Sequence, residues 1–351
     1  MKGLILAAGR GTRLRPLTHT RPKPVIRVAG RPIIQYAVAN LVQAGISQIG
    51  IVVSPDTEKD LRTALEHFPG AELSFIVQQE PQGLAHAVKA AREWLDQDPF
   101  VMYLGDNLFE KGITSYLKAF VQNPTAVVAL VKVPDPRQFG VALVEAGRIV
   151  RLMEKPKEPV SDLAIAGVYI FTPEIHEIIA DLKPSARGEY EITDAIQGLI
   201  DRGIPVQGVE VTGWWKDTGR PEDLLDANRL ILEDLEPKVE GLVTGSRVIG
   251  RVVIEEGATI LDSTILGPAF VASGAVVENA YVGPFTSLGP RARVRGAEVE
   301  FSILEDGAVI EDVALRLHEC ILGVNTKVTT RVSFPRAHRL ILGDLASVEL
   351  G

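Results

Sequence analysis

Short apolar runs alternate with longer amphipathic stretches up to about residue 236 of the chain. The apolar runs predict strands at residues 3–6, 49–53, 73–77, 101–104, 126–131 and 168–171. The amphipathic stretches predict helices at residues 32–44, 57–67, 84–96, 113–121, 173–181, 192–201 and 221–235. This alternation predicts an α/β domain with an open, mostly parallel sheet that is covered on both faces. Ligands bind such sheets beyond the carboxyl ends of the strands, so the loops that follow strands are the candidate functional segments.

A different pattern begins after residue 240, where helical periodicity gives way to a six-residue period. Small branched apolar residues recur at this spacing, at Val248, Ile254, Ile260, Leu266, Val282, Leu288, Val294, Leu304, Ile310, Leu322 and Val328. The period predicts a left-handed parallel β-helix, in which three short strands make one coil and the repeated aliphatic residue stacks inside it. A β-sandwich is the alternative, but it does not require a strict repeat of six. We therefore predict a first domain at residues 1–236, a linker at 237–246, and a β-helix with a C-terminal tail at 247–351.

Composition narrows the range of partners. The 351 residues include 37 Lys and Arg against 45 Asp and Glu, a net charge of −8, so nucleic acid and anionic membranes are not expected partners. The single cysteine, Cys320, excludes an internal disulfide framework and a zinc site built from protein thiolates alone. No apolar segment is as long as a membrane span, and residues 1–8 lead into a glycine loop that does not look like a signal-peptide cleavage site. We expect a soluble protein of the cytoplasm.

The first predicted strand leads into a loop with two glycines and several basic residues, Leu6-Ala7-Ala8-Gly9-Arg10-Gly11-Thr12-Arg13. The loop lacks the Gly-Lys-Ser/Thr ending of a Walker A loop and the third glycine of the dinucleotide fingerprint. Gly9 and Gly11 would still let the backbone approach an anion closely, while exposed amides, Arg13 and the later Lys23 would neutralise its charge. An ordinary strand-to-helix turn with solvated arginines is the alternative. The clustering of basic residues favours phosphate binding.

Two aspartates are candidate metal ligands. Asp106 follows the strand predicted at residues 101–104, and Asp217 lies in the run Lys216-Asp217-Thr218-Gly219. Mg²⁺ prefers one or two carboxylates together with substrate phosphates, which two aspartates from separate loops would satisfy. Alternatively, Asp106 starts a turn and Asp217 caps a helix near Pro221. The spacing alone does not pair the two residues.

The run from Leu6 to Pro16, followed by Lys23-Pro24 and Gly30-Arg31-Pro32-Ile33, resembles the signature of the sugar-1-phosphate nucleotidyltransferases. The resemblance extends over nearly the whole chain and implies a Rossmann-like nucleotidyltransferase domain with an appended β-helix. It also implies a Mg²⁺ ion held by Asp106 and Asp217, with Arg13 and Lys23 as further catalytic groups. The residues implied to contact the nucleotide are Leu6, Ala8, Gly9, Gly11, Thr12, Arg13, Gln78, Pro81, Gly83 and Asp106.

A second group of residues is expected to bind the sugar phosphate. In Glu154-Lys155-Pro156 a carboxylate suits ring hydroxyls and a cation suits phosphate, although outside the family context a plain charge pair on a hairpin would be preferred. Arg187 lies in a motif that resembles one of the family's and that also has the features of a helix start. The residues implied to contact the sugar phosphate are Gly140, Glu154, Lys155, Gly167, Tyr169, Arg187 and Trp215.

Gln78 and Gly83 match the pattern of the family members that use dTTP. A glutamine amide both donates to and accepts from an imide, and a glycine allows the backbone to contact the base. The resemblance therefore implies that glucose 1-phosphate attacks dTTP, giving dTDP-glucose and pyrophosphate without a covalent enzyme intermediate. Thymine differs from uracil by one methyl group, worth roughly 1–3 kcal/mol, so use of UTP or another nucleotide is the alternative.

Two further alternatives concern activities other than nucleotidyl transfer. Hexapeptide β-helices host acetyltransferases, for which His318 or His338 would have to serve as the base. A regulatory subunit without catalysis is the other alternative, which the complete set of candidate catalytic residues disfavours. We expect the β-helix to contribute to the interface of a homo-oligomer.

Overall fold

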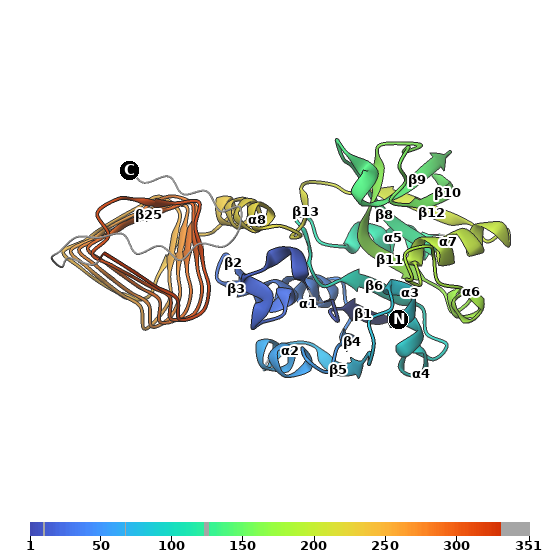
Figure 1. The fold of residues 1–351 in the computed structure, drawn as a ribbon, viewed down its shortest axis with the longest axis horizontal. Coiled ribbons are helices and arrows are strands. Elements are labelled where there is room, and N and C mark those ends of the chain that lie inside the picture. Colours follow the sequence, from blue (N-terminus) through green and yellow to red (C-terminus); the bar gives the residue numbers. More distant parts are fainter. Residues whose placement is uncertain (10, 67, 123–125, 331–351) are drawn as a thin grey trace, which may run out of the picture.

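The computed structural model describes residues 1–9, 11–66, 68–122 and 126–330. They form an α/β domain and a β-helix that lie next to each other (Figure 1). Nine strands of the first domain make one sheet in the order β5-β4-β1-β6-β11-β8-β12-β10-β9. Their bounds are β1 Lys2–Leu6, β4 Gln48–Val53, β5 Glu72–Val77, β6 Phe100–Leu104, β8 Ala126–Lys132, β9 Gly140–Glu145, β10 Arg148–Glu154, β11 Leu163–Phe171 and β12 Val206–Glu210.

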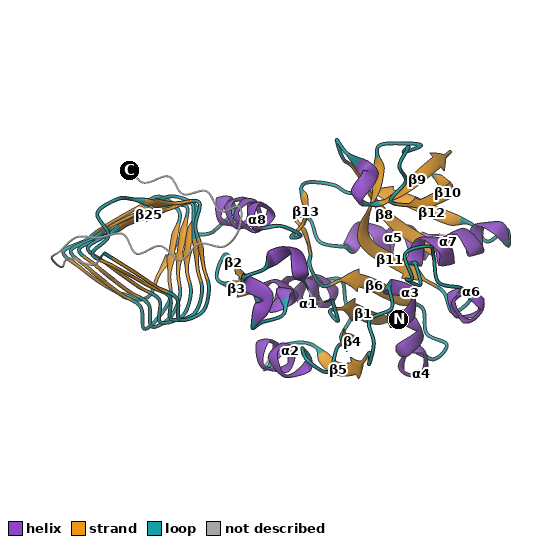
Figure 2. Cartoon of the chain, viewed as in Figure 1, coloured by secondary structure: helices purple, strands orange, loops and turns teal. Residues whose placement is uncertain are grey.

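Helices cover both faces of this sheet (Figure 2). Successive side chains of a strand point to opposite faces, so both faces of an apolar strand need cover. In β1, Leu4 and Leu6 belong to the apolar cluster on one face, and Ile5 belongs to the cluster on the other. The first cluster also takes in residues of α3, α4, α6 and α7, and the second takes in residues of α1, α2 and α5. The helices are α1 Ile33–Gln43, α2 Glu58–Leu65, α3 Leu84–Ala90, α4 Arg92–Leu95, α5 Thr114–Gln122, α6 Ile175–Asp181, α7 Ile192–Asp201 and α8 Pro221–Glu233.

The predicted α/β sheet with helices on both faces is confirmed, and the structure differs from the prediction in three details. Strands β1, β4, β5 and β6 are parallel, whereas β11 and β10 each run antiparallel to both of their neighbours in the sheet order. The helix predicted at residues 84–96 is divided between α3 and α4 at Ala91. The sequence pattern did not reveal β9, β10 and β12. Arg151 interrupts the apolar residues of β10, and Gln207 and Gly208 interrupt those of β12, whereas β9 has an unbroken apolar run that the prediction missed.

A parallel β-helix follows, as predicted, and its three faces are three parallel sheets. The handedness stays a prediction. One face contains β14 Lys238–Val239, β17 Val252–Ile254, β20 Ala269–Val271, β23 Thr286–Leu288, β26 Ile303–Leu304 and β29 Ile321–Leu322. The second contains β15 Leu242–Thr244, β18 Thr259–Leu261, β21 Val276–Glu278, β24 Arg293–Arg295, β27 Val309–Glu311 and β30 Lys327–Thr329. The third contains β16 Arg247–Ile249, β19 Thr264–Leu266, β22 Tyr281–Val282, β25 Glu298–Glu300 and β28 Leu317–His318.

Two sequence-based expectations about this domain need correction. The residues predicted as a linker, 237–246, instead form part of the first coil, since β14 and β15 pair in parallel with β17 and β18. Leu242 pairs with Thr259, which pairs with Val276, so the first coils repeat after 17 residues and are one residue shorter than three full hexapeptides. Later coils are uneven, since Arg293 pairs with Val309 and Val309 pairs with Lys327. The inward position therefore shifts relative to a strict period of six, and Ile265, not the predicted Leu266, is fully buried in the stack.

One face of the β-helix packs on the first domain through α8 and the hairpin of β2 Arg27–Val28 and β3 Arg31–Pro32 (Figure 1). The buried Asn228 of α8 joins the two domains, because its Oδ1 accepts from Ser287 Oγ at 2.8 Å and its Nδ2 donates to the Phe285 carbonyl at 2.9 Å. Among the described residues, no helix combines the length and apolar character that crossing a membrane requires.

Candidate active site

The loop after β1 lies directly against Lys23. Gly11 has a φ of +59°, in the left-handed region that favours glycine. A Cβ atom at Gly11 would lie 2.9 Å from the Cβ of Lys23, so the close approach also requires glycine. The hydroxyl of Thr18 donates to the Gly11 carbonyl at 2.7 Å and holds the loop in place. A Cβ built at Gly9 would meet no described atom within 4 Å, so this part of the loop faces open space.

Two short strands bring the predicted metal ligands together. Strand β7 Asn107–Phe109 follows Asp106, and it pairs antiparallel with β13 Trp215–Asp217 so that Asp217 lies opposite Asn107. The Thr218 hydroxyl and amide both donate to the Asp106 carbonyl, at 2.8 and 3.2 Å. The pairing therefore places the two carboxylates in one site, although they are far apart in the sequence.

A single buried ammonium group lies between these carboxylates. Lys23, with 7% of its surface exposed, places Nζ 2.8 Å from Asp106 Oδ2 and 3.3 Å from Asp217 Oδ1. Burial alone would lower the pKa of Lys23, but the two carboxylates outweigh it and raise the pKa above its ordinary value.

The two carboxylates differ in how readily they take up a proton. Burial and the negative charge of Asp106 raise the pKa of Asp217 to about 6 in spite of Lys23. Burial also acts to raise the pKa of Asp106, but the Lys23 charge and hydrogen bonds from Lys23 and Asn107 hold it below the ordinary value. Two adjacent carboxylate ligands, with positions left for phosphate oxygens and water, fit a hard divalent cation such as Mg²⁺.

A cavity of about 880 Å³ opens over this site. It is bordered by the glycine loop, by both aspartates and by the segment from Gln78 to Leu84. All ten residues expected to contact the nucleotide line it, as do all four expected catalytic residues. Together these are Leu6, Ala8, Gly9, Gly11, Thr12, Arg13, Lys23, Gln78, Pro81, Gly83, Asp106 and Asp217. The fold therefore gathers the whole predicted nucleotide and catalytic set around one cavity, whose size suits a nucleotide.

Backbone hydrogen bonds join the segment that carries Gln78 and Gly83 to Tyr190. Gly83 has a φ of +107°, and a Cβ atom there would lie 2.6 Å from the Tyr190 carbonyl oxygen. The Tyr190 carbonyl accepts from the Ala85 amide at 3.0 Å, and the Tyr190 amide donates to the Gln82 carbonyl at 2.8 Å. Glycine at position 83 is thus needed both for its backbone conformation and for this close contact.

Three of the residues predicted to bind the sugar phosphate meet at Glu154. Arg187 Nη1 donates to Glu154 Oε1 at 3.1 Å, and Lys155 Nζ lies 3.7 Å from the same oxygen. Thr193 Oγ1 donates to Glu154 Oε2 at 3.2 Å. A Cβ at Gly140 would lie 2.8 Å from Thr193 Cγ2, so Gly140 borders the same group. These residues adjoin one another but are not part of the lining of the 880 Å³ cavity.

The remaining predicted sugar-phosphate residues adjoin the aspartates through Asn107. Trp215 Nε1 donates to Asn107 Oδ1 at 2.8 Å, and a Cβ at Gly167 would lie 2.9 Å from Asn107 Cγ. Asn107 Nδ2 in turn donates to Asp106 Oδ1 at 2.8 Å. Tyr169 is different, since it is almost fully buried in the core with its ring stacked on Phe171. Burial, with the negative charges of Glu154 and Asp106, raises the pKa of Tyr169.

Three residues at this site were not singled out by the sequence analysis: Asn107, Thr193 and Thr218. Asn107 orients Asp106 and Trp215, Thr218 holds the Asp106 backbone, and Thr193 holds Glu154. Asn107 and Thr218 directly follow the two predicted metal ligands, which is the one signal in the sequence that could have indicated them.

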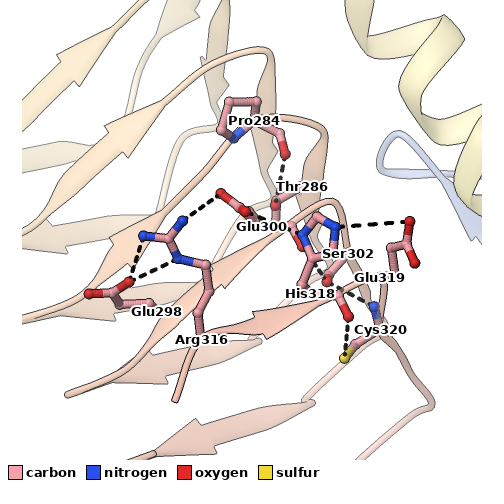
Figure 3. Close-up of polar contacts among 9 residues, drawn as sticks. All are labelled: Pro284, Thr286, Glu298, Glu300, Ser302, Arg316, His318, Glu319 and Cys320. Carbon is pink, nitrogen blue, oxygen red and sulfur yellow. Dashed lines mark hydrogen bonds and ion pairs between the residues drawn. The ribbon is translucent and has the colours of Figure 1, made fainter. Parts of the chain in front are cut away.

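His318, one of the two candidate bases for acetyl transfer, belongs to a polar cluster on the β-helix (Figure 3). Its Nδ1 lies 3.2 Å from Glu300 Oε1, and Arg316 donates to both Glu298 and Glu300, at 2.9 and 3.1 Å. His338, the other candidate, lies outside the described residues. Acetyl transfer therefore stays an alternative hypothesis.

Comparisons with known proteins agree with this geometry. Residues 2–234 match the protein family described as Nucleotidyl transferase. The glucose-1-phosphate thymidylyltransferases of Streptomyces antibioticus and Streptomyces griseus are each 46% identical to this chain over 356 residues, covering 100% of it and 99% of their own length. A crystal structure from Bacillus anthracis, assigned as a glucose-1-phosphate thymidylyltransferase, is 36% identical with a TM-score of 0.63, over 68% of this chain and 97% of that one. The chain belongs to the nucleotidyl transferase family.

Proposed function

We propose that the protein transfers a thymidylyl group from dTTP to glucose 1-phosphate, giving dTDP-glucose and pyrophosphate. The observation that carries this proposal is the single cavity shared by the glycine loop, Lys23, the two aspartates and the segment with Gln78 and Gly83. The two Streptomyces relatives, which align from end to end, are named for the same activity.

In this proposal the two substrates occupy neighbouring parts of the site. The phosphates of dTTP lie on the loop from Gly9 to Arg13, where open backbone and a cation suit an anion. The base lies toward Gln78, Pro81 and Gly83, with Leu6 and Ala8 at the end of β1 bordering the nucleoside. The sugar phosphate lies toward Glu154, Lys155 and Arg187, with Gly140, Gly167, Tyr169 and Trp215 shaping the surroundings.

The chemistry requires charge neutralisation more than proton transfer. A phosphate oxygen of glucose 1-phosphate forms a bond to the α-phosphorus of dTTP, and the bond from that phosphorus to the β-phosphate bridging oxygen breaks, so pyrophosphate leaves with the electron pair. The attacking oxygen is already an anion, so no general base is needed. Lys23 and Arg13 lower the repulsion between the two polyanions and hold the α-phosphate in line with the attacking oxygen. A Mg²⁺ ion held by Asp106 and Asp217 would stabilise negative charge on the phosphate oxygens.

The test is pyrophosphate release with glucose 1-phosphate and Mg²⁺, with dTTP, UTP, GTP, ATP and CTP supplied separately. We expect dTTP to be the best substrate and UTP the second, because uracil keeps the imide edge and lacks only the methyl group. Preference for GTP or ATP would overturn the assignment of the base. The absence of pyrophosphate release with every nucleotide would overturn the proposed activity. Chelation of Mg²⁺ should abolish any activity that is seen.

We also propose that the protein is a homo-oligomer of the cytoplasm, with the β-helix in its interface. Apolar side chains lie exposed on this domain, including Leu242, Ile249 and Leu315, the last with 81% of its surface exposed. Burying such side chains against a second copy would stabilise an assembly. Light scattering should give a mass above that of one chain, and Leu242→Glu together with Ile249→Glu should lower it. A monomeric wild-type protein would contradict this proposal.

A further inference from the structure

The side-chain amide of Gln78 is hydrogen-bonded to a residue that does not line the cavity. Its side chain lines the cavity yet only 3% of its surface is exposed. His86, on the first turn of α3, is not among the residues that line the cavity, and its Nδ1 lies 2.8 Å from Gln78 Nε2. The His86 ring is itself packed on the Tyr190 ring, with ring centroids 5.9 Å apart and planes 28° from parallel. The Gln78 amide group is therefore fixed by a partner that need not touch substrate.

The hydrogen bond decides which atom of Gln78 remains for a ligand. An amide nitrogen only donates, so it requires an unprotonated Nδ1 on His86, with the ring proton on Nε2. The amide oxygen of Gln78 is then left as an acceptor. Burial and the nearby Lys89 lower the pKa of His86 while Glu80 opposes them, and the result favours the neutral ring that this bond needs.

We propose that His86 is a positioning residue for nucleobase selection, which orients Gln78 so that its Oε1 atom accepts from the ring N–H of an imide pyrimidine. Thymine and uracil carry this donor at N3, whereas cytosine carries an acceptor there and would meet Oε1 with a repulsive contact. The inference rests on the proposed function and adds to it the physical basis of the choice of base. It assigns His86 a role distinct from that of the residues touching the nucleotide.

Two substitutions separate this role from simple packing. His86→Phe keeps a ring against Tyr190 but removes the acceptor, so Gln78 becomes free to rotate. His86→Asn places a carbonyl oxygen at the position of Nδ1 and preserves the acceptor. For His86→Phe we expect the KM for dTTP to rise about tenfold, because losing one well-oriented hydrogen bond weakens binding by about that factor. We expect kcat to change little. The preference for dTTP over dCTP in kcat/KM should fall by a similar factor, and His86→Asn should retain most of it.

His318→Phe, on the outer face of the β-helix, serves as the matched control and should change neither quantity. A His86→Phe enzyme with unchanged KM and unchanged preference for dTTP over dCTP would overturn the inference. So would a wild-type enzyme that uses dCTP as well as dTTP.

A second measurement on the wild-type protein does not depend on how the variants fold. ¹⁵N chemical shifts of the histidine ring, assigned by the signal lost in His86→Asn, should show the proton on Nε2 of His86. A proton on Nδ1 would overturn the inference whatever the kinetics. Should the wild type show no activity with any nucleotide, the proposed function fails, whereas the ring tautomer and the relative binding of dTTP and dCTP still decide the role of His86.

Discussion

The Nζ atom of Lys23 lies 2.8 Å from Oδ2 of Asp106. This ion pair joins the segment that follows β1 to the end of β6, the neighbour of β1 in the sheet. Because the same ammonium lies 3.3 Å from Asp217, one buried positive charge balances two carboxylates that otherwise repel each other. Removing one member of such a buried group leaves the others without compensation. The three residues are therefore expected to act as one unit in both stability and catalysis.

Asp106→Asn should lower kcat by about a hundredfold or more, since it removes a charged ligand from the site where negative charge develops on the phosphates. The change is nearly isosteric and keeps the hydrogen-bonding groups close to their positions. Pyrophosphate release at saturating dTTP and glucose 1-phosphate measures it. Asp135→Asn, at an exposed residue paired with Arg137, is the control and should keep the wild-type rate. A loss confined to KM would contradict the assignment of Asp106.

Lys155→Ala should raise the KM for glucose 1-phosphate about tenfold or more while kcat and the KM for dTTP change little, because the lost charge serves binding of one substrate. Lys155 has a φ of +40°, and its Nζ lies near Glu154. Alanine also carries a Cβ, so the substitution leaves the backbone strain at this position unchanged and removes only the rest of the side chain. Lys157→Ala, at an exposed neighbouring lysine, is the matched control. Equal small effects from Lys155→Ala and Asp106→Asn would argue against the division of roles between them.

Gly11→Ala and Gly9→Ala should separate structure from binding within one loop. At Gly11 a methyl group meets Lys23 at 2.9 Å and the backbone has positive φ, so we expect about 1–3 kcal/mol lost in the free energy of unfolding. At Gly9 a methyl group enters open space beside the cavity, so stability should be unchanged while the KM for dTTP rises. Urea unfolding and steady-state kinetics of both variants test this. The reverse pattern would refute the description of the loop.

His176 should make stability depend on pH in the mildly acidic range. Both ring nitrogens are buried without a hydrogen-bond partner among the described residues, and the ring stacks on Phe100. Burial and the charge of Arg92 lower the pKa of His176 from 6.5 to about 4. Between these values the unfolded chain binds a proton that the folded chain does not, so stability falls as the pH falls from about 6.5 to about 4, by at most about 3 kcal/mol.

His176→Phe removes this contribution. Urea unfolding at pH 7 and pH 4.5 should show the variant gaining stability relative to wild type as the pH is lowered. A difference between the two proteins that stays constant with pH would contradict the expectation. His318→Phe, at an exposed histidine, is the comparison.

Arg21→Ala should weaken the junction between the domains. Its Nη1 donates to the buried Glu305 of the β-helix at 2.9 Å, and the Arg27 amide donates to the other oxygen of Glu305 at 2.7 Å. Loss of one partner from a buried carboxylate should cost about 1–3 kcal/mol, measured by thermal or urea unfolding. Arg291→Ala, at an exposed residue, should cost much less. Glu305→Gln in the Arg21→Ala background should recover part of the loss, and no recovery would contradict this account.

The sequence by itself determined the elements whose signals are local. The alternation of apolar runs and amphipathic stretches indicated the α/β domain, and the recurring aliphatic residues indicated the β-helix. The glycine loop could also be identified from the sequence, because Gly9, Gly11 and Arg13 follow a buried strand within a few residues. These features depend on neighbouring residues along the chain, so their spacing could be interpreted before any contact was known.

Only the tertiary structure decided which distant residues meet. The antiparallel pairing of β7 with β13 brings Asp217 beside Asp106, and no spacing in the sequence encodes it. The 17-residue coil, which buries Ile265 instead of Leu266, depends on the lengths of the corners between strands. The hydrogen bond from Gln78 Nε2 to His86 Nδ1 depends on how α3 packs against the end of β5. In each case the deciding quantity is the relative placement of two elements, which the packing of the whole domain determines.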